Sequence, residues 1–125
     1  MRSLVGVLRN LVLGLVVLVG VAACSPSPSE PVPPDAVVVD VRTPQEFAEG
    51  HLEGALNIDL GSGAFEQQIG ALPADGSYVV YCRSGNRSAQ AVEIMTKLAF
   101  GQVTDAGCLQ AAAQATRLAI AAGRH

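Results

Sequence analysis

Residues 78–88 read YVVYCRSGNRS, and this stretch decides the fold class. Its first four residues are apolar and β-favouring, which predicts a buried strand that ends at Cys82. Five small, polar or basic residues follow, and residues 88–99 then carry apolar side chains at helical spacing. We therefore expect a strand, a short loop and a helix, with Cys82 at the carboxyl end of the strand.

This arrangement places Cys82 opposite the N-terminus of the expected helix. Free backbone N–H groups and the helix dipole stabilise an anion there, and this favours the reactive thiolate form of a cysteine. Arg83 and Arg87 add positive charge that suits an anionic substrate. A structural cysteine at the end of a core strand is the alternative. The two loop arginines favour the nucleophile over it, because a structural cysteine does not need them.

Two segments of the chain resemble one known family. CRSGNRS at residues 82–88 resembles the active-site loop of the single-domain rhodaneses, which are thiosulfate-type sulfurtransferases. DVRTPQEF at residues 40–47 and GHLEGALNI at residues 50–58 are similar to that family's DVR…EF…GH-x-x-GA-x-N signature, in the same order and at comparable spacing. The resemblance implies an α/β fold, namely a three-layer rhodanese-like domain whose small parallel sheet has helices on both faces.

The resemblance also implies a reaction. A Cys82 thiolate would take sulfane sulfur from a donor such as thiosulfate, form a persulfide, and pass the sulfur to a thiol or to cyanide. The expected partners are a small anionic sulfur donor and a thiol acceptor, and no metal or other cofactor is needed. Cys82 is then catalytic, and the loop residues that would bind substrate are Arg83, Ser84, Gly85, Asn86 and Arg87.

Four further residues are candidates for supporting roles. Asp40 and Arg42 lie at the end of the first expected strand, where the family has a network close to the loop. For Asp40 we favour a structural ion pair or backbone bond over a part in substrate binding, and Arg42, with Glu46 at the entry of the next helix, is expected to be structural. His51 is expected to organise its own loop and not to act as a base. Cys108 is expected just past the last strand, where a thiol could resolve an oxidised or persulfidated Cys82. A buried, inert cysteine is the favoured alternative for Cys108.

Two other function classes remain open. Phosphatases of the related cell-cycle or arsenate-reductase type have Cys-x5-Arg loops, but here four residues separate Cys82 from Arg87 and Ser88 follows. The shorter loop therefore favours sulfur chemistry. A catalytically idle or thiol-redox module is the second alternative, although an intact cysteine and two arginines argue against idleness. The histidines and cysteines lack the spacing of metal ligands, so we expect no metal site.

The remaining elements can be placed from local signals. Thr43, Pro44 and Glu46 form the pattern of an N-cap, a first-turn proline and a capping box, so a short helix should begin there and end at Gly50. Strands that alternate with helices imply a parallel sheet with covered faces. The other expected strands are residues 36–41, 56–58 and 102–104, and the other expected helices are residues 64–69 and 108–122.

The N-terminal third has the pattern of an export signal. Arg2 and Arg9 frame a basic region, and residues 11–21 are apolar but too few to span a bilayer. The run VAAC ending at Cys24 resembles a bacterial lipobox, in which cleavage leaves a lipidated cysteine. An ordinary signal peptide is the alternative. We therefore expect residues 1–23 to be a lipoprotein signal peptide and Cys24 to be the lipidation site.

The segment after Cys24 is expected to be a tether, because five prolines and three serines in SPSPSEPVPP cannot form a core. This divides the chain into a tether at residues 24–34 and a rhodanese-like domain at residues 35–125. Without residues 1–23, six basic residues face eleven acidic ones, a net charge of −5, which gives no basic face for nucleic acid. The expected location is the extracytoplasmic side of the cell membrane, held by a lipid anchor in the cell envelope.

Overall fold

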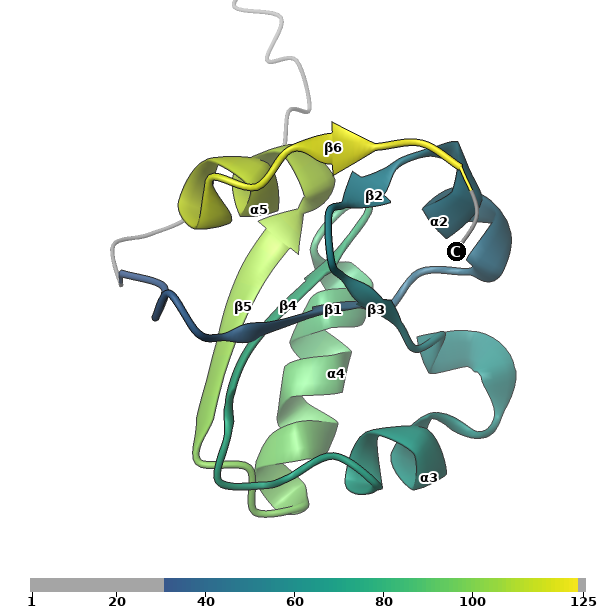
Figure 1. The fold of residues 1–125 in the computed structure, drawn as a ribbon. Helices are drawn as coiled ribbons and strands as arrows, with labels where there is room; N and C mark the ends of the chain where they lie inside the picture. Colours follow the sequence, from purple (N-terminus) through teal and green to yellow (C-terminus); the bar gives the residue numbers. More distant parts are fainter. Residues whose placement is uncertain (1–30, 124–125) are drawn as a thin grey trace, which may run out of the picture.

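The computed structural model of the chain describes residues 31–123, and a parallel four-stranded sheet lies at its centre. The strand order is β3-β1-β4-β5, and every neighbouring pair runs parallel (Figure 1). These strands are β1 (Val37–Asp40), β3 (Leu56–Asn57), β4 (Ser77–Cys82) and β5 (Gln102–Cys108). The helices are α2 (Pro44–Glu49), α3 (Phe65–Gly70), α4 (Asn86–Lys97) and α5 (Leu109–Thr116), with a 3₁₀ turn at Leu60–Ser62.

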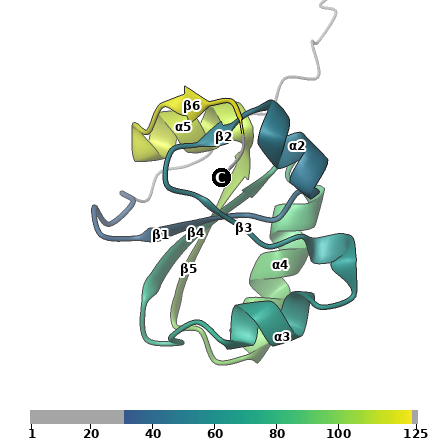
Figure 2. The same ribbon diagram turned by 45° about the vertical axis from the view of Figure 1, so that its right-hand side comes forward.

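The central strand β4 is buried on both faces because its side chains alternate between two cores. Tyr78, Val80 and Cys82 pack in one core with side chains of α3 and α4. Val79 and Tyr81 pack in the other with side chains of β2 (His51–Leu52) and α5. Figures 1 and 2 show α3 and α4 on one side of the sheet and α5 on the other. The prediction of a three-layer α/β domain with helices on both faces is therefore confirmed.

The start of α2 follows its capping residues as predicted. The Glu46 backbone N–H donates to Thr43 Oγ1 at 3.2 Å, and the Thr43 N–H donates to Glu46 Oε1 at 3.3 Å. Pro44 occupies the first turn, where its missing N–H costs no hydrogen bond. The N–H of Gly50 donates to the Phe47 carbonyl at 3.2 Å and ends the helix.

Helix α4 begins two residues earlier than residue 88, where the sequence predicted it. Its N-cap is Gly85, with φ of 100°, and no side chain caps the helix. Glycine adopts this left-handed conformation without a Cβ clash, so the chain turns sharply after β4. Only residues 83–85 separate strand from helix, and Asn86 and Arg87 lie in the first turn of α4 and not in the loop.

The C-terminal part differs from the prediction of one long helix over residues 108–122. β5 extends to Cys108, and α5 ends where Arg117 adopts a left-handed conformation with φ of 61°. The chain then forms β6 (Ile120–Ala121), which pairs antiparallel with β2 (His51–Leu52). Alanine favours helix by propensity, but backbone pairing with a distant strand determines the structure of these last residues.

Residues 1–30 and 124–125 lie outside the described part of the chain. The expected signal peptide, the lipidation site Cys24 and the first part of the tether therefore stay predictions. Within residues 31–123, no helix has the length and apolar character that would let it cross a membrane.

The hydroxyl of Tyr81 connects the sheet to β2 and provides a test of this packing. Tyr81 is fully buried, and its hydroxyl oxygen accepts a hydrogen bond from the Leu52 backbone N–H at 3.0 Å. Tyr81→Phe leaves that N–H without its partner, so the free energy of unfolding should fall by about 1–3 kcal/mol, measured by urea denaturation.

Tyr78→Phe is the matched control for this test. The Tyr78 hydroxyl donates to the Pro73 carbonyl in a partly buried hydrogen bond, so its removal leaves only an acceptor that water can reach. The free energy of unfolding of Tyr78→Phe should therefore fall by about 1 kcal/mol or less. Equal losses in the two variants would contradict the role assigned to the Tyr81–Leu52 contact.

Candidate active site

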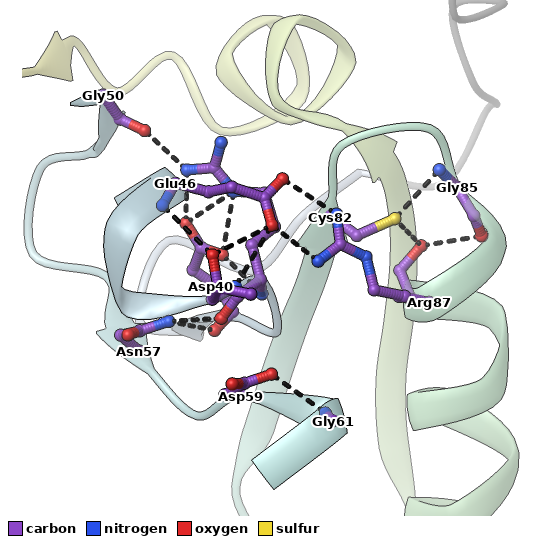
Figure 3. A network of polar contacts seen from close by, with 12 residues as sticks. Asp40, Glu46, Gly50, Asn57, Asp59, Gly61, Cys82, Gly85 and Arg87 are labelled. Carbon is purple, nitrogen blue, oxygen red and sulfur yellow. Dashed lines mark hydrogen bonds and ion pairs between the residues drawn. The ribbon is translucent and has the colours of Figure 1, made fainter. Parts of the chain in front are cut away.

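Cys82 is the last residue of β4, and its sulfur lies inside the short turn that leads to α4 (Figure 3). The Gly85 backbone N–H donates to Cys82 Sγ at 2.9 Å. The Cys82 thiol lies 3.4 Å from Ser88 Oγ, and the Ser88 hydroxyl donates to the Gly85 carbonyl at 3.0 Å. Cys82 is fully buried, so the loop covers its sulfur and separates it from solvent.

Ser88 is a site residue that the sequence analysis did not select. It is fully buried and contacts the sulfur directly, although it lies six residues after Cys82. The available signal was its position as the last residue of the CRSGNRS motif. A hydroxyl there can accept from the thiol and, once the sulfur is ionised, donate to it by rotation of its O–H.

The other predicted substrate-binding residues lie in the turn and at the start of α4. Arg83, Ser84 and Asn86 are exposed, and Gly85 and Arg87 are partly buried. Besides its bond to the sulfur, Gly85 approaches the neighbouring strand closely, since a Cβ placed on it lies 4.0 Å from the Cα of Gly107. The predicted substrate-binding set is thus collected at one end of β4, and its role in binding stays a prediction.

Arg87 is held by an acidic residue of another helix. Its guanidinium donates to both carboxylate oxygens of Glu46, at 2.7 and 2.9 Å, and so joins α4 to α2 (Figure 3). The hydrogen bond from Arg87 is the main cause that lowers the pKa of Glu46 to about 2, and burial opposes it. Arg87 is therefore partly neutralised, and Arg83 is the exposed arginine of the loop.

Asp40 and Arg42 form an ion pair with each other, whereas the sequence grouped Arg42 with Glu46, which instead pairs with Arg87. Both are buried, and Arg42 Nε and Nη2 donate to the Asp40 carboxylate at 3.0 and 2.7 Å. Arg42 Nη2 also donates to the Gly50 carbonyl at 2.5 Å. Burial opposes the charge of Arg42, but the hydrogen bond and the negative charge of Asp40 outweigh it and raise the pKa of Arg42. Arg42 is therefore a buried cation that fixes the chain between β1 and β2.

His51 has the organising place expected for it. It is buried, its Nδ1 lies 2.7 Å from the Phe47 carbonyl oxygen, and its ring stacks on Phe47 with centroids 3.7 Å apart. These contacts join the end of α2 to β2.

Cys108 is buried and lies beside Cys82 on the neighbouring strand. It is the last residue of β5 and not a residue beyond the strand, and it is in register with Cys82 on β4. Cys82 is a free cysteine, so the two are not joined to each other. The role of Cys108 as a resolving thiol stays a prediction.

A cleft of about 300 Å³ opens next to the loop and is called the α2–α5 cleft below. It is lined by α2, by the start of α5, and by residues on either side of the active-site turn. The lining residues are Arg42, Glu46, Glu49, Gly50, Arg83, Leu109 and Gln110. Its walls thus combine two basic and two acidic side chains at one end of the sheet.

The family model for the rhodanese-like domain matches residues 30–111, a stretch that contains β1 to β5, the Cys82 loop and the start of α5. The chain belongs to the rhodanese-like domain family. The sequence prediction of this family is therefore confirmed.

Similar curated proteins are named as sulfurtransferases. The thiosulfate sulfurtransferase PspE of Escherichia coli is 37% identical over 73 residues, which are 58% of this chain and 69% of that protein. A sulfurtransferase of Allochromatium vinosum is 36% identical over 55% of this rhodanese-like chain and 63% of its own length. The thiosulfate sulfurtransferase GlpE of Pseudomonas aeruginosa is 41% identical over 54% and 60%. The chain thus spans less than two thirds of the last two relatives.

Solved structures agree with this fold. The rhodanese-like chain matches a structure described as "rhodanese with anions from E. coli" with a TM-score of 0.60 and 28% identity, over 70% of this chain and 99% of that one. A rhodanese-related protein of Thermoplasma volcanium matches with a TM-score of 0.52 and 33% identity, over 58% and 69%.

The Glu46–Arg87 pair should give the rhodanese-like domain an acid-sensitive part of its stability. Because the pKa of Glu46 is lower in the folded chain than its usual value of 4.5, the pair stabilises the fold above that value. This contribution is lost as the pH falls toward about 2. Glu46→Gln keeps a residue suited to the capping box but removes the charge, so the gap in free energy of unfolding between wild type and variant should shrink with acidification.

The control for this measurement is Glu93→Gln, which removes the exposed i,i+4 pair with Lys97. Its side chains are 69% and 74% exposed, against 21% and 30% for Glu46 and Arg87. At neutral pH we expect the free energy of unfolding to fall by about 1 kcal/mol for Glu46→Gln and by only a few tenths of a kcal/mol for Glu93→Gln. If the difference in free energy of unfolding between wild type and Glu46→Gln stays constant between neutral pH and about pH 3, the Glu46–Arg87 pair is not the source of acid-sensitive stability.

Proposed function

We propose that this rhodanese-like protein is a sulfurtransferase that carries sulfane sulfur on Cys82. One observation supports this above the others: the Cys82 sulfur lies at the carboxyl end of β4, accepts the Gly85 N–H at 2.9 Å, and is enclosed by the turn that begins α4. Relatives named thiosulfate sulfurtransferases, at 37% and 41% identity, support the same chemistry. N–H groups of this kind stabilise a sulfur anion without a metal.

In the first step the Cys82 thiolate attacks the outer sulfur of a donor such as thiosulfate. A new S–S bond forms on Cys82, the S–S bond of thiosulfate breaks, and its electron pair leaves with sulfite. The outer sulfur of the persulfide extends about 2 Å beyond Cys82 Sγ, which brings the reacting atom away from the buried position of the cysteine. Arg83, exposed beside the cysteine, is the side chain suited to attract the dianionic donor.

In the second step an acceptor thiolate attacks that outer sulfur. The S–S bond on Cys82 breaks, its electron pair returns to Cys82 as a thiolate, and the acceptor leaves as a persulfide. The Gly85 N–H and the Ser88 hydroxyl lie where they can hold the sulfur anion at the start and at the end of the cycle. The reaction as proposed proceeds through side chains and backbone groups of the chain itself.

The contacts of Arg87 argue against the phosphatase alternative. A phosphatase loop uses its arginine to hold a tetrahedral oxyanion, but both terminal nitrogens of Arg87 donate to Glu46. An oxyanion would have to displace a bidentate carboxylate to reach this guanidinium.

Cys82→Ser should abolish formation of the persulfide. Mass spectrometry of the purified protein after incubation with thiosulfate should show the gain of one sulfur atom on the wild type, located on the Cys82 peptide, and none on the variant. The hydroxyl that this substitution introduces is small and still has the Gly85 N–H and Ser88 as partners, so the melting temperature should change little. Sulfur transfer that persists in a folded variant would rule out Cys82 as the carrier.

We also propose that the enzyme acts outside the cytoplasm, anchored to the membrane by lipid on Cys24. The lipobox-like VAAC run and the Pro/Ser-rich segment after it support this proposal, because a lipid-anchored domain needs a spacer.

Cys24→Ser should move the protein from the membrane fraction to the soluble fraction, because the acyl chains provide the attachment. The measurement is an immunoblot of separated membranes and supernatant, with Cys82→Ser as the control that keeps the anchor. A Cys24→Ser protein that stays with the membranes would indicate that the apolar N-terminal segment itself is the anchor.

A further inference from the structure

The α2–α5 cleft carries two charges that have no ionic partner among the described residues. Of the four ionic side chains in its lining, Arg42 is paired with Asp40, and Glu46 is paired with Arg87. Arg83 and Glu49 are different, because none of the ion pairs within residues 31–123 includes either of them. The cleft therefore offers a cation and an anion to a ligand.

The cleft is also next to the sulfur that reacts. Arg83 directly follows Cys82 in the chain, and Glu46 is bonded to Arg87 in the first turn of α4, the helix that begins at the turn around the sulfur. A persulfide on Cys82 and a molecule in this cleft can therefore come together at the loop. A donor dianion needs only Arg83, so Glu49 has no use in the first step of the proposed reaction.

We infer that the α2–α5 cleft selects an amphoteric low-molecular-weight thiol as the sulfur acceptor, with Glu49 binding its ammonium group and Arg83 its carboxylate. This inference rests on the proposed sulfurtransferase function and adds the chemical class of the second substrate. A volume of about 300 Å³ is at the lower end of ligand pockets, which suits an amino-acid thiol or a short peptide thiol. An acceptor with only acidic groups would face the uncompensated charge of Glu49.

The bond changes are those of the second step. The thiol loses its proton to solvent, its thiolate forms an S–S bond with the outer sulfur, and the electron pair of the broken S–S bond remains on Cys82. Glu49 and Arg83 only position the acceptor, so they should change its binding and not the intrinsic reactivity of the persulfide.

The test uses four thiols that differ by single charged groups. Cysteine and 3-mercaptopropionate differ only in the ammonium group, and cysteine and cysteamine differ only in the carboxylate, while 2-mercaptoethanol has neither. The full-length protein is first loaded with thiosulfate, and loss of the persulfide from the Cys82 peptide is then followed in a single turnover for each thiol. Each rate is expressed per thiolate and divided by the rate of the same thiolate with a small persulfide in solution. This normalised rate is compared because the four thiols ionise to different extents and a less acidic thiol gives the stronger nucleophile.

For the wild type, the normalised rate should be higher for cysteine than for either thiol that lacks one of its charged groups. Glu49→Gln should reduce the advantage of cysteine over 3-mercaptopropionate by roughly 1.5- to 5-fold, the range expected from one exposed ion pair, and should not slow 3-mercaptopropionate. Arg83→Gln should reduce the advantage of cysteine over cysteamine by a similar factor. Glu66→Gln, on the exposed surface of α3, changes the net charge equally and should leave both ratios unchanged.

The outcomes separate this inference from the proposed function. If persulfide forms but cysteine and 3-mercaptopropionate have equal normalised rates, or if Glu49→Gln and Glu66→Gln have the same effect, the inference is overturned and the sulfurtransferase function stands. If no persulfide forms on the wild type, the proposed function fails first, and the acceptor site fails with it.

Discussion

A buried guanidinium has to be neutralised and hydrogen-bonded, and Arg42 meets this demand through Asp40 and the Gly50 carbonyl. Asp40 ends β1, and Gly50 lies between α2 and β2, so these contacts set the angle at which α2 leaves the sheet. Glu46 on α2 then reaches Arg87 on α4, and α4 begins at the turn that holds the Cys82 sulfur. The contacts of Arg42 with Asp40 and with Gly50, followed by the contact of Glu46 with Arg87, thus connect the first strand to the helix that begins beside the sulfur.

The apolar cores give this chain of contacts a rigid support. β4 is buried by helices on both faces and carries Cys82 as its last residue, so the sulfur is attached to the best-packed strand of the sheet. Within the described part of the chain, every buried side-chain nitrogen and oxygen atom has a hydrogen-bond partner. Of the ionic side chains that line the α2–α5 cleft, Arg83 and Glu49 are in none of the ion pairs within residues 31–123.

The sequence was informative wherever a local rule determines the structure. The capping residues Thr43, Pro44 and Glu46 predicted the start of α2, and the apolar run before Cys82 predicted β4. The family motifs predicted the three-layer fold. Contacts between distant residues could not be predicted in this way: the partner of Arg87 is Glu46, forty-one positions away, and nothing local indicates that pairing. The same limit applies to the C-terminus, where alanine content predicted a helix although Ile120 and Ala121 pair with β2.

The pairing of β6 with β2 has a consequence for the order of folding. His51 is in register with Ala121, seventy positions later, and such long-range pairing is slow because a large loop must close first. During synthesis β1, α2 and β2 leave the ribosome long before their last partner strand. Gly50, which holds Arg42 and lines the α2–α5 cleft, adjoins this late contact, since Ile120 Cγ2 lies 3.5 Å from a Cβ placed on it. The cleft can thus be completed only after residues 120–121 have left the ribosome, so a nascent chain can hold an ordered β4 before this cleft is complete.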